Sequence, residues 1–109
     1  TIHGIDAGID SGPILRHARP QITPDDMPHT IGCKAILAGI EAMIDVLRTL
    51  ERDGSVSAIP QWSVPVEKLY LRKDYHPRQV LELYRKIDAG LIRRFASGER
   101  RTAPVKLVE

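Results

Sequence analysis

The sequence predicts an α/β fold with two strands, a long amphipathic helix and then a second helix. Three features indicate it: a β-branched run at the start, a loop rich in Gly and Pro after it, and an apolar stripe of helical period in the middle.

The first strand is predicted over residues 1–5, and residues 6–13 form a loop punctuated by Gly and Pro. A second extended segment covers residues 14–22, where Pro20 has no N–H to donate and marks an end or an edge. Because Thr1 stands inside an apolar run, we expect a chain cut from something longer or one half of a split protein.

A helix is predicted to start at residues 23–26 and to run to about Arg52. Asp26 can accept from unpaired N–H groups at its start, and Pro28 suits its first turn. Gly54 follows as a stop signal. The stripe that we expect to face the core consists of Ile36, Ile40, Met43, Leu47 and Leu50.

The second half is predicted to be less regular. Residues 55–68 form a surface crossing with one short strand at most, and residues 69–71 form a brief strand. A second helix begins at His76-Pro77 and ends at Ser97-Gly98, and Gly90 weakens it by roughly 1 kcal/mol relative to Ala. Residues 99–109 form a tail. The stripe of this helix is Val80, Tyr84, Ile87, Leu91 and Phe95.

Composition excludes several classes of protein. The chain has no run of about 18 apolar residues, so we predict no membrane span. The single cysteine, Cys33, cannot form an internal disulfide, which favours a cytoplasmic location. Its place in the helical pattern predicts a small core residue. The spacing of the acidic residues does not fit a calcium loop, and we expect no metal.

The net charge of +2 conceals an asymmetry. Residues 1–71 hold 6 Lys/Arg and 9 Asp/Glu, whereas residues 72–109 hold 10 Lys/Arg and 5 Asp/Glu. A basic end can attract nucleic acid, but five aromatic residues offer few platforms for stacked bases. Nucleic acid is therefore not the expected partner. We expect a solvated face and a loose tail to hold Arg93, Arg94, Arg100 and Arg101.

The candidate chemistry lies between His3 and Ile14, where two carboxylates and an imidazole occur together. Loops at strand ends are where α/β proteins bind ligands, and a carboxylate close to an imidazole can handle protons. Gly8 and Gly12 allow backbone turns that are closed to other residues. The residues alone leave two interpretations open: a proton-transfer site, or a turn capped by Asp10 beside a core histidine.

The motif Asp10-Ser11-Gly12-Pro13-Ile14 resembles a signature of the 10-formyltetrahydrofolate-dependent formyltransferases. His3 precedes Asp10 by seven residues, as in several members. The resemblance covers roughly residues 1–62 and implies the C-terminal portion of the family's Rossmann-like fold. Residues 1–54 would be the end of the catalytic domain, and residues 55–109 the crossing segment, second helix and basic tail.

The resemblance implies transfer of a formyl group from 10-formyltetrahydrofolate to an amine acceptor. Asp10 would be the catalytic aspartate, which keeps an upstream histidine protonated and helps to move the amine's proton, and His3 would support it. The backbone of one loop segment would grip the pterin ring of the folate. That segment is Ile5, Asp6, Ala7, Gly8 and Ile9.

The chain departs from the family in one respect. It contains no Asn, so the family's Asn-x-His motif, which stabilises the developing oxyanion, is missing together with the nucleotide-fold half. We therefore expect no formyltransferase activity from this chain alone. The upstream half, in cis or in trans, is an expected partner.

Two alternatives remain open at this point. Formyltetrahydrofolate hydrolases resemble the same family and pass the formyl group to water. A non-catalytic interaction module would instead dock a partner on the apolar stripes of its two helices. The tail is too short for the β-barrel domain that methionyl-tRNA formyltransferases add, so the expected acceptor is a nucleotide-linked sugar amine or a small metabolite amine.

Overall fold

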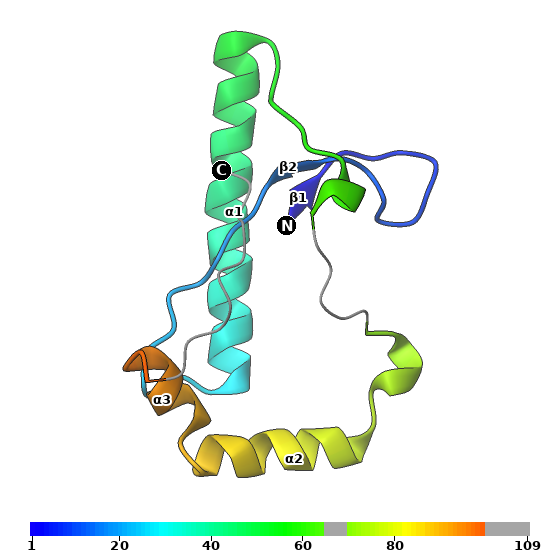
Figure 1. The fold of residues 1–109 in the computed structure, drawn as a ribbon. Coiled ribbons are helices and arrows are strands. Elements are labelled where there is room, and N and C mark those ends of the chain that lie inside the picture. Colours follow the sequence, from blue (N-terminus) through cyan, green and yellow to red (C-terminus); the bar gives the residue numbers. More distant parts are fainter. Residues whose placement is uncertain (65–69, 100–109) are drawn as a thin grey trace.

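The computed structural model describes residues 1–64 and 70–99. Two short strands lie against the middle of one long helix, and two shorter helices lie near the end at which that helix begins (Figure 1). The predicted α/β content is therefore present. The elements in chain order are β1 (Ile2–His3), β2 (Ile14–Arg16), α1 (Pro28–Asp53), the 3-10 turns η1 (Gln61–Ser63) and η2 (Arg72–Asp74), α2 (Pro77–Asp88) and α3 (Leu91–Ala96).

The two strands pair antiparallel, with His3 opposite Ile14. A third segment joins them on the far side of β2, where Ile14 and Ile59 exchange two backbone hydrogen bonds of 2.7 and 2.8 Å. Ile14 is thus held from both sides and is buried. The single bridge at Ile59 is the short strand expected in the crossing segment.

The brief strand predicted at residues 69–71 is not formed by its described part. Tyr70 and Leu71 are irregular, and Leu71 leads into η2. Residues 65–69 lie outside the described residues. The side chain of Asp74 accepts from the Leu71 N–H at 2.8 Å, which favours this turn over an extended strand.

Helix α1 ends within one residue of the prediction, but it begins at Pro28, after the predicted start at residues 23–26. Met27 is its N-cap, and the Met27 N–H donates to Thr30 Oγ1 at 2.7 Å, with Pro28 at the first helical position. At the other end Gly54 adopts a left-handed φ of 72°, and its N–H donates to the Leu50 carbonyl at 2.9 Å. Both ends follow from local chemistry.

Asp26 does not cap α1 in the way predicted. Its carboxylate accepts from the Thr23 N–H at 2.7 Å and from Lys34 Nζ at 2.6 Å, and its side chain is 6% exposed. The ion pair with Lys34, followed by the bond from Thr23, holds the pKa of this carboxyl well below its usual range. Asp26 therefore fastens the preceding turn to the second turn of the helix.

The predicted core stripe of α1 does not face the strands, and this prediction was wrong. Ala42 and Val46 are the buried residues, and they pack with Ile2 of β1. The stripe lies about a third of a turn round the helix from them, given 3.6 residues per turn. Cys33, expected in the core, is exposed as well. The exposed stripe residues are Ile36, Ile40, Met43, Leu47 and Leu50.

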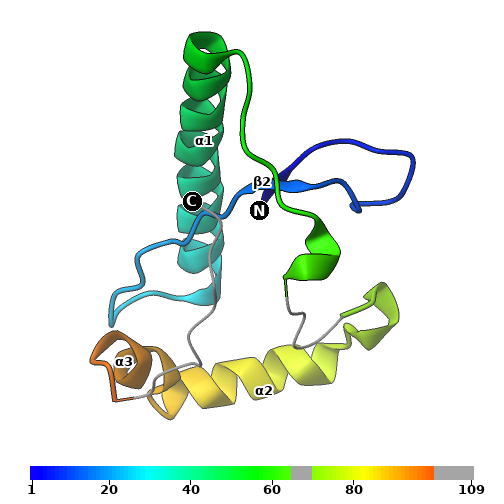
Figure 2. The same cartoon turned by 45° about the horizontal axis from the view of Figure 1, so that its top comes forward.

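The chain does not close around one core. Its Cα radius of gyration is 16.4 Å, whereas a compact domain of this size would have about 13 Å. Among the described residues no large side chain is fully buried. Helix α2 lies across the end of α1, away from the strands, in both views (Figure 1 and Figure 2). Helix α1 consequently keeps an apolar side that is exposed within the described part of the chain.

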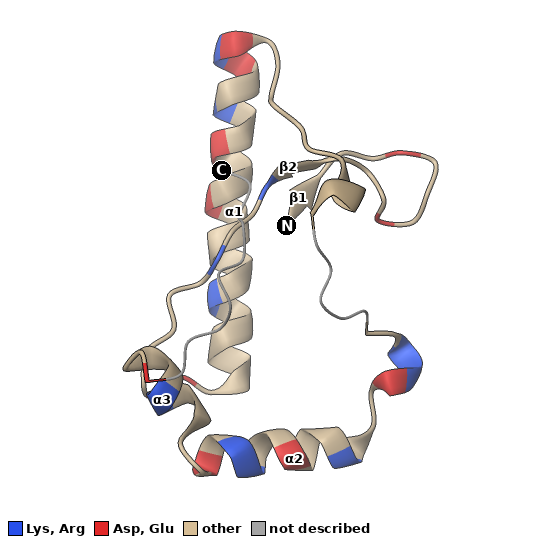
Figure 3. Ribbon diagram, viewed as in Figure 1, with Lys and Arg blue, Asp and Glu red and all other residues tan. Residues whose placement is uncertain are grey.

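The predicted second helix is divided in two. Gly90 has a φ of 85°, a left-handed conformation that separates α2 from α3, so its effect exceeds the weakening that was predicted. Charged residues of both signs alternate along α2 (Figure 3). Arg93 and Arg94 are exposed, as expected, whereas residues 100–109 lie outside the described residues. No helix in the described ranges is long and apolar enough to cross a membrane.

Candidate functional site

The loop between β1 and β2 is closed at its base by the Gly4 N–H, which donates to the Pro13 carbonyl at 2.9 Å. Beyond that bond the loop projects from the strands away from α1 (Figure 1 and Figure 2). Asp6 organises its interior, because Asp6 Oδ1 accepts from the Gly8 N–H at 2.9 Å and from Ser11 Oγ at 2.7 Å. These bonds, that of Ser11 foremost, lower the pKa of Asp6. Asp6 is thus the carboxylate that forms the turn.

The carboxylate of Asp10 does not form the turn. Its side chain is 88% exposed, and its Oδ1 lies 3.8 Å from Nε2 of His3, whose side chain is 29% exposed. The other ring nitrogen of His3, Nδ1, lies 2.8 Å from the Gly4 carbonyl oxygen, so Nε2 is the nitrogen that faces the carboxylate. The two residues predicted to be catalytic are brought together.

The left-handed backbone of this loop occurs at Asp10, with a φ of 50°. The glycines were expected to supply such turns, but neither Gly8 nor Gly12 has a positive φ. Gly8 and Gly12 are needed instead because a side chain at either position would not fit. A Cβ on Gly12 would collide with the backbone carbonyl of Gly4, and one on Gly8 would collide with Ser11 Oγ. Asp is among the few residues that tolerate the left-handed region.

His3 and Asp10 border two hollows. The smaller, about 120 Å³, lies inside the loop. The larger, about 420 Å³, lies on the strand side and is also lined by Ile14, His17 and Gln61. Only the larger reaches the usual range for small-molecule sites, about 300–1,000 Å³.

His17 and Gln61 were not predicted as site residues. Burial lowers the pKa of His17, which favours its neutral form. Both reach the cleft because β2 pairs with β1 on one side and with Ile59 on the other. No local pattern signals that pairing, although His17 does follow the Asp10 motif on the predicted second strand.

The loop segment predicted to hold a folate is fully open. The side chains of Ile5 and Ile9 are 99% and 95% exposed. Ile5, Ala7 and Ile9 make no hydrogen bond within the described part of the chain. Asp6 and Gly8 are bonded to each other. Three of the five residues therefore offer unpaired backbone donors and acceptors.

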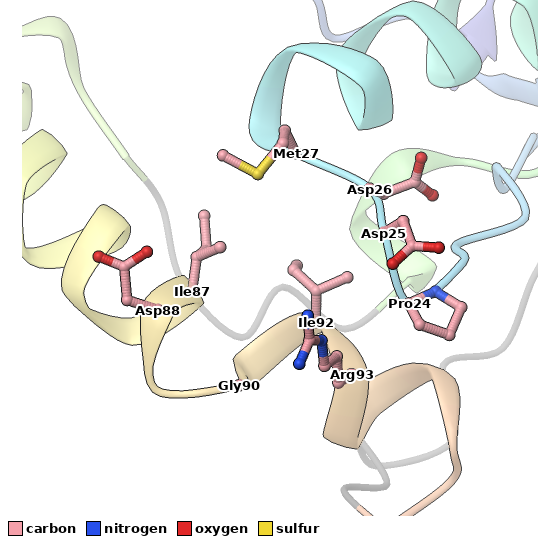
Figure 4. A pocket seen from close by; sticks show the side chains of 9 residues that line it. All are labelled: Pro24, Asp25, Asp26, Met27, Ile87, Asp88, Gly90, Ile92 and Arg93. Carbon is pink, nitrogen blue, oxygen red and sulfur yellow. The ribbon is translucent and has the colours of Figure 1, made fainter.

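Another cleft, of about 360 Å³, lies between residues 24–27 and the corner joining α2 to α3. Figure 4 shows Met27, Ile87 and Ile92 around it. The carboxylate of Asp26 is occupied by Lys34. This cleft lies at the N-terminal end of α1 and gathers none of the predicted site residues. Within residues 1–64 and 70–99 no cluster of His, Cys, Asp or Glu suits a metal ion.

Comparison with known proteins points to one family. Over 61 residues the chain is 43% identical to methionyl-tRNA formyltransferases of Burkholderia pseudomallei and Burkholderia thailandensis, and 38% identical to that of Burkholderia multivorans. This identity supports a relationship to the formyltransferases. The matched segment is 56% of this chain but only 19% of each relative. No family model and no solved structure matches.

The relationship agrees with the resemblance seen in the Asp10 motif, and the relatives it joins to this chain are named as formyltransferases. The small α/β arrangement of two strands and three helices is compatible with the C-terminal region of such an enzyme. The chain spans about a fifth of the length of the relatives it matches.

Proposed function

We propose that this chain carries the catalytic aspartate of an enzyme that transfers a formyl group from 10-formyltetrahydrofolate to an amine. The observation that carries the proposal is the placement of Asp10. Its carboxylate is free of its own turn, stands 3.8 Å from His3 and borders a cleft of about 420 Å³. The relatives' formyltransferase names support the reaction class.

Acyl transfer to an amine requires the nitrogen to lose a proton. An ionised carboxylate at the cleft can accept that proton, directly or through a neighbouring imidazole. In its protonated form His3 can orient Asp10, because Nδ1–H then donates to the Gly4 carbonyl while Nε2–H faces the carboxylate. The cleft beside them gives the amine a place to approach.

The donor, 10-formyltetrahydrofolate, supplies the formyl group when bound. The segment from Ile5 to Ile9 suits a flat heterocycle that has a donor and acceptor edge. Ile5, Ala7 and Ile9 have unpaired backbone groups, and two of these residues add exposed apolar side chains. Burying those side chains would stabilise the complex by the hydrophobic effect.

The enzyme also requires an upstream half, in cis or in trans. The family's Asn-x-His oxyanion donors would come from there, because this chain has no Asn. The exposed apolar side of α1 supports the presence of such a half, since a helix that is apolar on two sides is normally buried. In this arrangement residues 1–54 complete the catalytic domain and residues 55–109 form its extension. The exposed, free thiol of Cys33 fits the proposed cytoplasmic location.

The test joins this chain to an upstream half taken from the Burkholderia thailandensis relative. Formyl transfer from 10-formyltetrahydrofolate is measured with methionyl-tRNA, the acceptor in that relative's name, and with nucleotide-linked sugar amines. We expect a formylated amine only when both halves are present. Formate release without an amine would indicate a hydrolase instead, and absence of turnover with every acceptor would contradict the proposal.

A further inference from the structure

We infer that Gln61 is a positioning residue that fixes Asp10 for the reaction. Gln61 Nε2 donates to the backbone carbonyl of Asp10 at 2.7 Å and to that of Gly12 at 2.7 Å. The inference rests on the proposed role of Asp10. It concerns a residue outside the Asp10 motif, 51 positions along the chain.

The geometry requires an amide at this position. Both partners are carbonyl oxygens, and a primary amide has two N–H groups on one nitrogen to offer them. The amide therefore joins the Asp10–Ser11 and Gly12–Pro13 peptide units. It closes the second half of the loop, whereas Asp6 closes the first half through Gly8 and Ser11.

Gln61 is itself held in place. It opens η1, and the Ser63 N–H and Ser63 Oγ both donate to the Pro60 carbonyl, at 3.0 and 2.7 Å. Two residues earlier, Ile59 is bonded to Ile14 of β2 in both directions. The amide is thus fixed to β2, the strand that follows the loop. Gln61 with its two hydrogen bonds, called the clamp below, is therefore a short and stiff connection.

The clamp acts where the backbone is least favourable. Asp10 has a φ of 50°, in the left-handed region that residues other than glycine rarely adopt. The bond to the Asp10 carbonyl opposes relaxation of that peptide. Because φ also sets the direction of the side chain, losing the bond would move the carboxylate away from His3.

The first arm of the test uses the full 109-residue chain and nuclear magnetic resonance. Gln61→Met keeps the length of the side chain and removes both donors. We expect the strong intraresidue NOE between the amide proton and Hα, which marks a positive φ, to disappear at Asp10. The signals of α1 should stay in place. Gln21→Met makes the same change at an exposed glutamine and should leave the loop signals unchanged.

Gln61→Glu adds a readout that simple packing would not move. At neutral pH the carboxylate repels both carbonyls, and the loop should be released. Once protonated, below about pH 4, the same side chain can donate one hydrogen bond. We expect the Asp10 NOE to return partly on acidification in this variant. A loop that keeps its positive φ in both variants overturns the inference, even if either variant is less stable.

The second arm uses the enzyme assembled with its upstream half. Gln61→Met should lower kcat by about 100-fold, the scale of a displacement of about 1 Å at a reacting group, with a smaller change in KM. An unchanged kcat overturns the positioning role. If the wild-type assembly transfers no formyl group while Gln61→Met still releases the loop, the proposed function fails and the clamp stands.

Discussion

Two carboxylates in one loop have different tasks because their hydrogen bonds differ. Asp6 is bonded to Gly8 and Ser11, which commits it to the turn. Asp10 makes no such bond and faces His3. The interpretation of the loop as a turn capped by Asp10 therefore applies to Asp6 instead. The carboxylate left for chemistry is the one that the family resemblance predicts.

The charge of Asp10 can be removed without altering its shape. Asn tolerates the left-handed φ as Asp does, so Asp10→Asn should leave the free energy of unfolding within about 0.5 kcal/mol of the wild type. Formyl transfer by the assembled enzyme should fall by a factor of about 10²–10⁴, because the amide cannot accept a proton. Steady-state rates and urea unfolding measure the two effects. Asp25→Asn is the control, and a near-normal rate in Asp10→Asn would remove the assignment.

Gly12 should resist substitution for lack of space. A Cβ there meets the Gly4 carbonyl, and Gly4 is held in place by its own N–H, which donates to the Pro13 carbonyl. Gly12→Ala should destabilise the chain by about 1–3 kcal/mol in urea unfolding. Gly32→Ala is the matched control, since Gly32 lies in α1 with nothing within 4 Å, and it should stabilise by about 0.5–1 kcal/mol. Equal midpoints for the two variants would contradict this account of the loop.

At the scale of elements, the start of α1 depends on one carboxylate. Asp26 joins the Thr23 turn to Lys34, and its pKa is lowered mainly by that lysine. A carboxyl with a lowered folded pKa contributes stability above its unfolded pKa and loses it as the pH falls through the folded value. The contribution of Asp26 should therefore be complete at neutral pH.

Urea unfolding of the wild type and Asp26→Asn between pH 7 and pH 2 tests this. The difference in free energy of unfolding between the two proteins should be constant down to about pH 5. It should then narrow steadily below about pH 4, where the carboxyl of the unfolded chain protonates. In a Lys34→Met background the difference should be smaller and should vanish at a higher pH. A difference independent of pH would mean that the ionised form of Asp26 does not stabilise α1.

At the scale of the whole molecule, α1 has two apolar sides and its own chain covers one. Val46 belongs to the covered side and Leu47 to the open one, where it is 55% exposed. The strands cross α1 near its middle, and α2 lies across its end (Figure 1). The open side is therefore the surface that the proposed upstream half would cover.

This difference predicts opposite behaviour of two neighbouring residues. In the chain alone, Val46→Ala should lower the free energy of unfolding by about 1.5–3 kcal/mol. Leu47→Ala should change that free energy by less than about 0.5 kcal/mol. With the upstream half present, Leu47→Ala should weaken association by about tenfold or more. Thermal unfolding and titration calorimetry measure these effects. A large cost of Leu47→Ala in the chain alone would place Leu47 in a core that the structure does not show.

Sequence patterns predicted the features that neighbouring residues decide. The start of α1 at Pro28 and its end at Gly54 follow from capping and backbone preferences. The loop and its Asp10 motif were also found in this way. The division of the second helix at Gly90 was missed, because a glycine inside a helical pattern is tolerated unless its φ becomes positive.

Sequence by itself determined the order of the two strands and the long helix, the C-terminal end of α1 and the loop that holds the candidate carboxylate. Tertiary structure alone decided which side of α1 meets the strands, that His3 faces Asp10, and that Gln61 reaches the loop. Periodicity shows that a helix has apolar sides but not which one a given strand will cover. Contacts between residues some fifty positions apart depend on where the chain returns, and no local preference encodes that return.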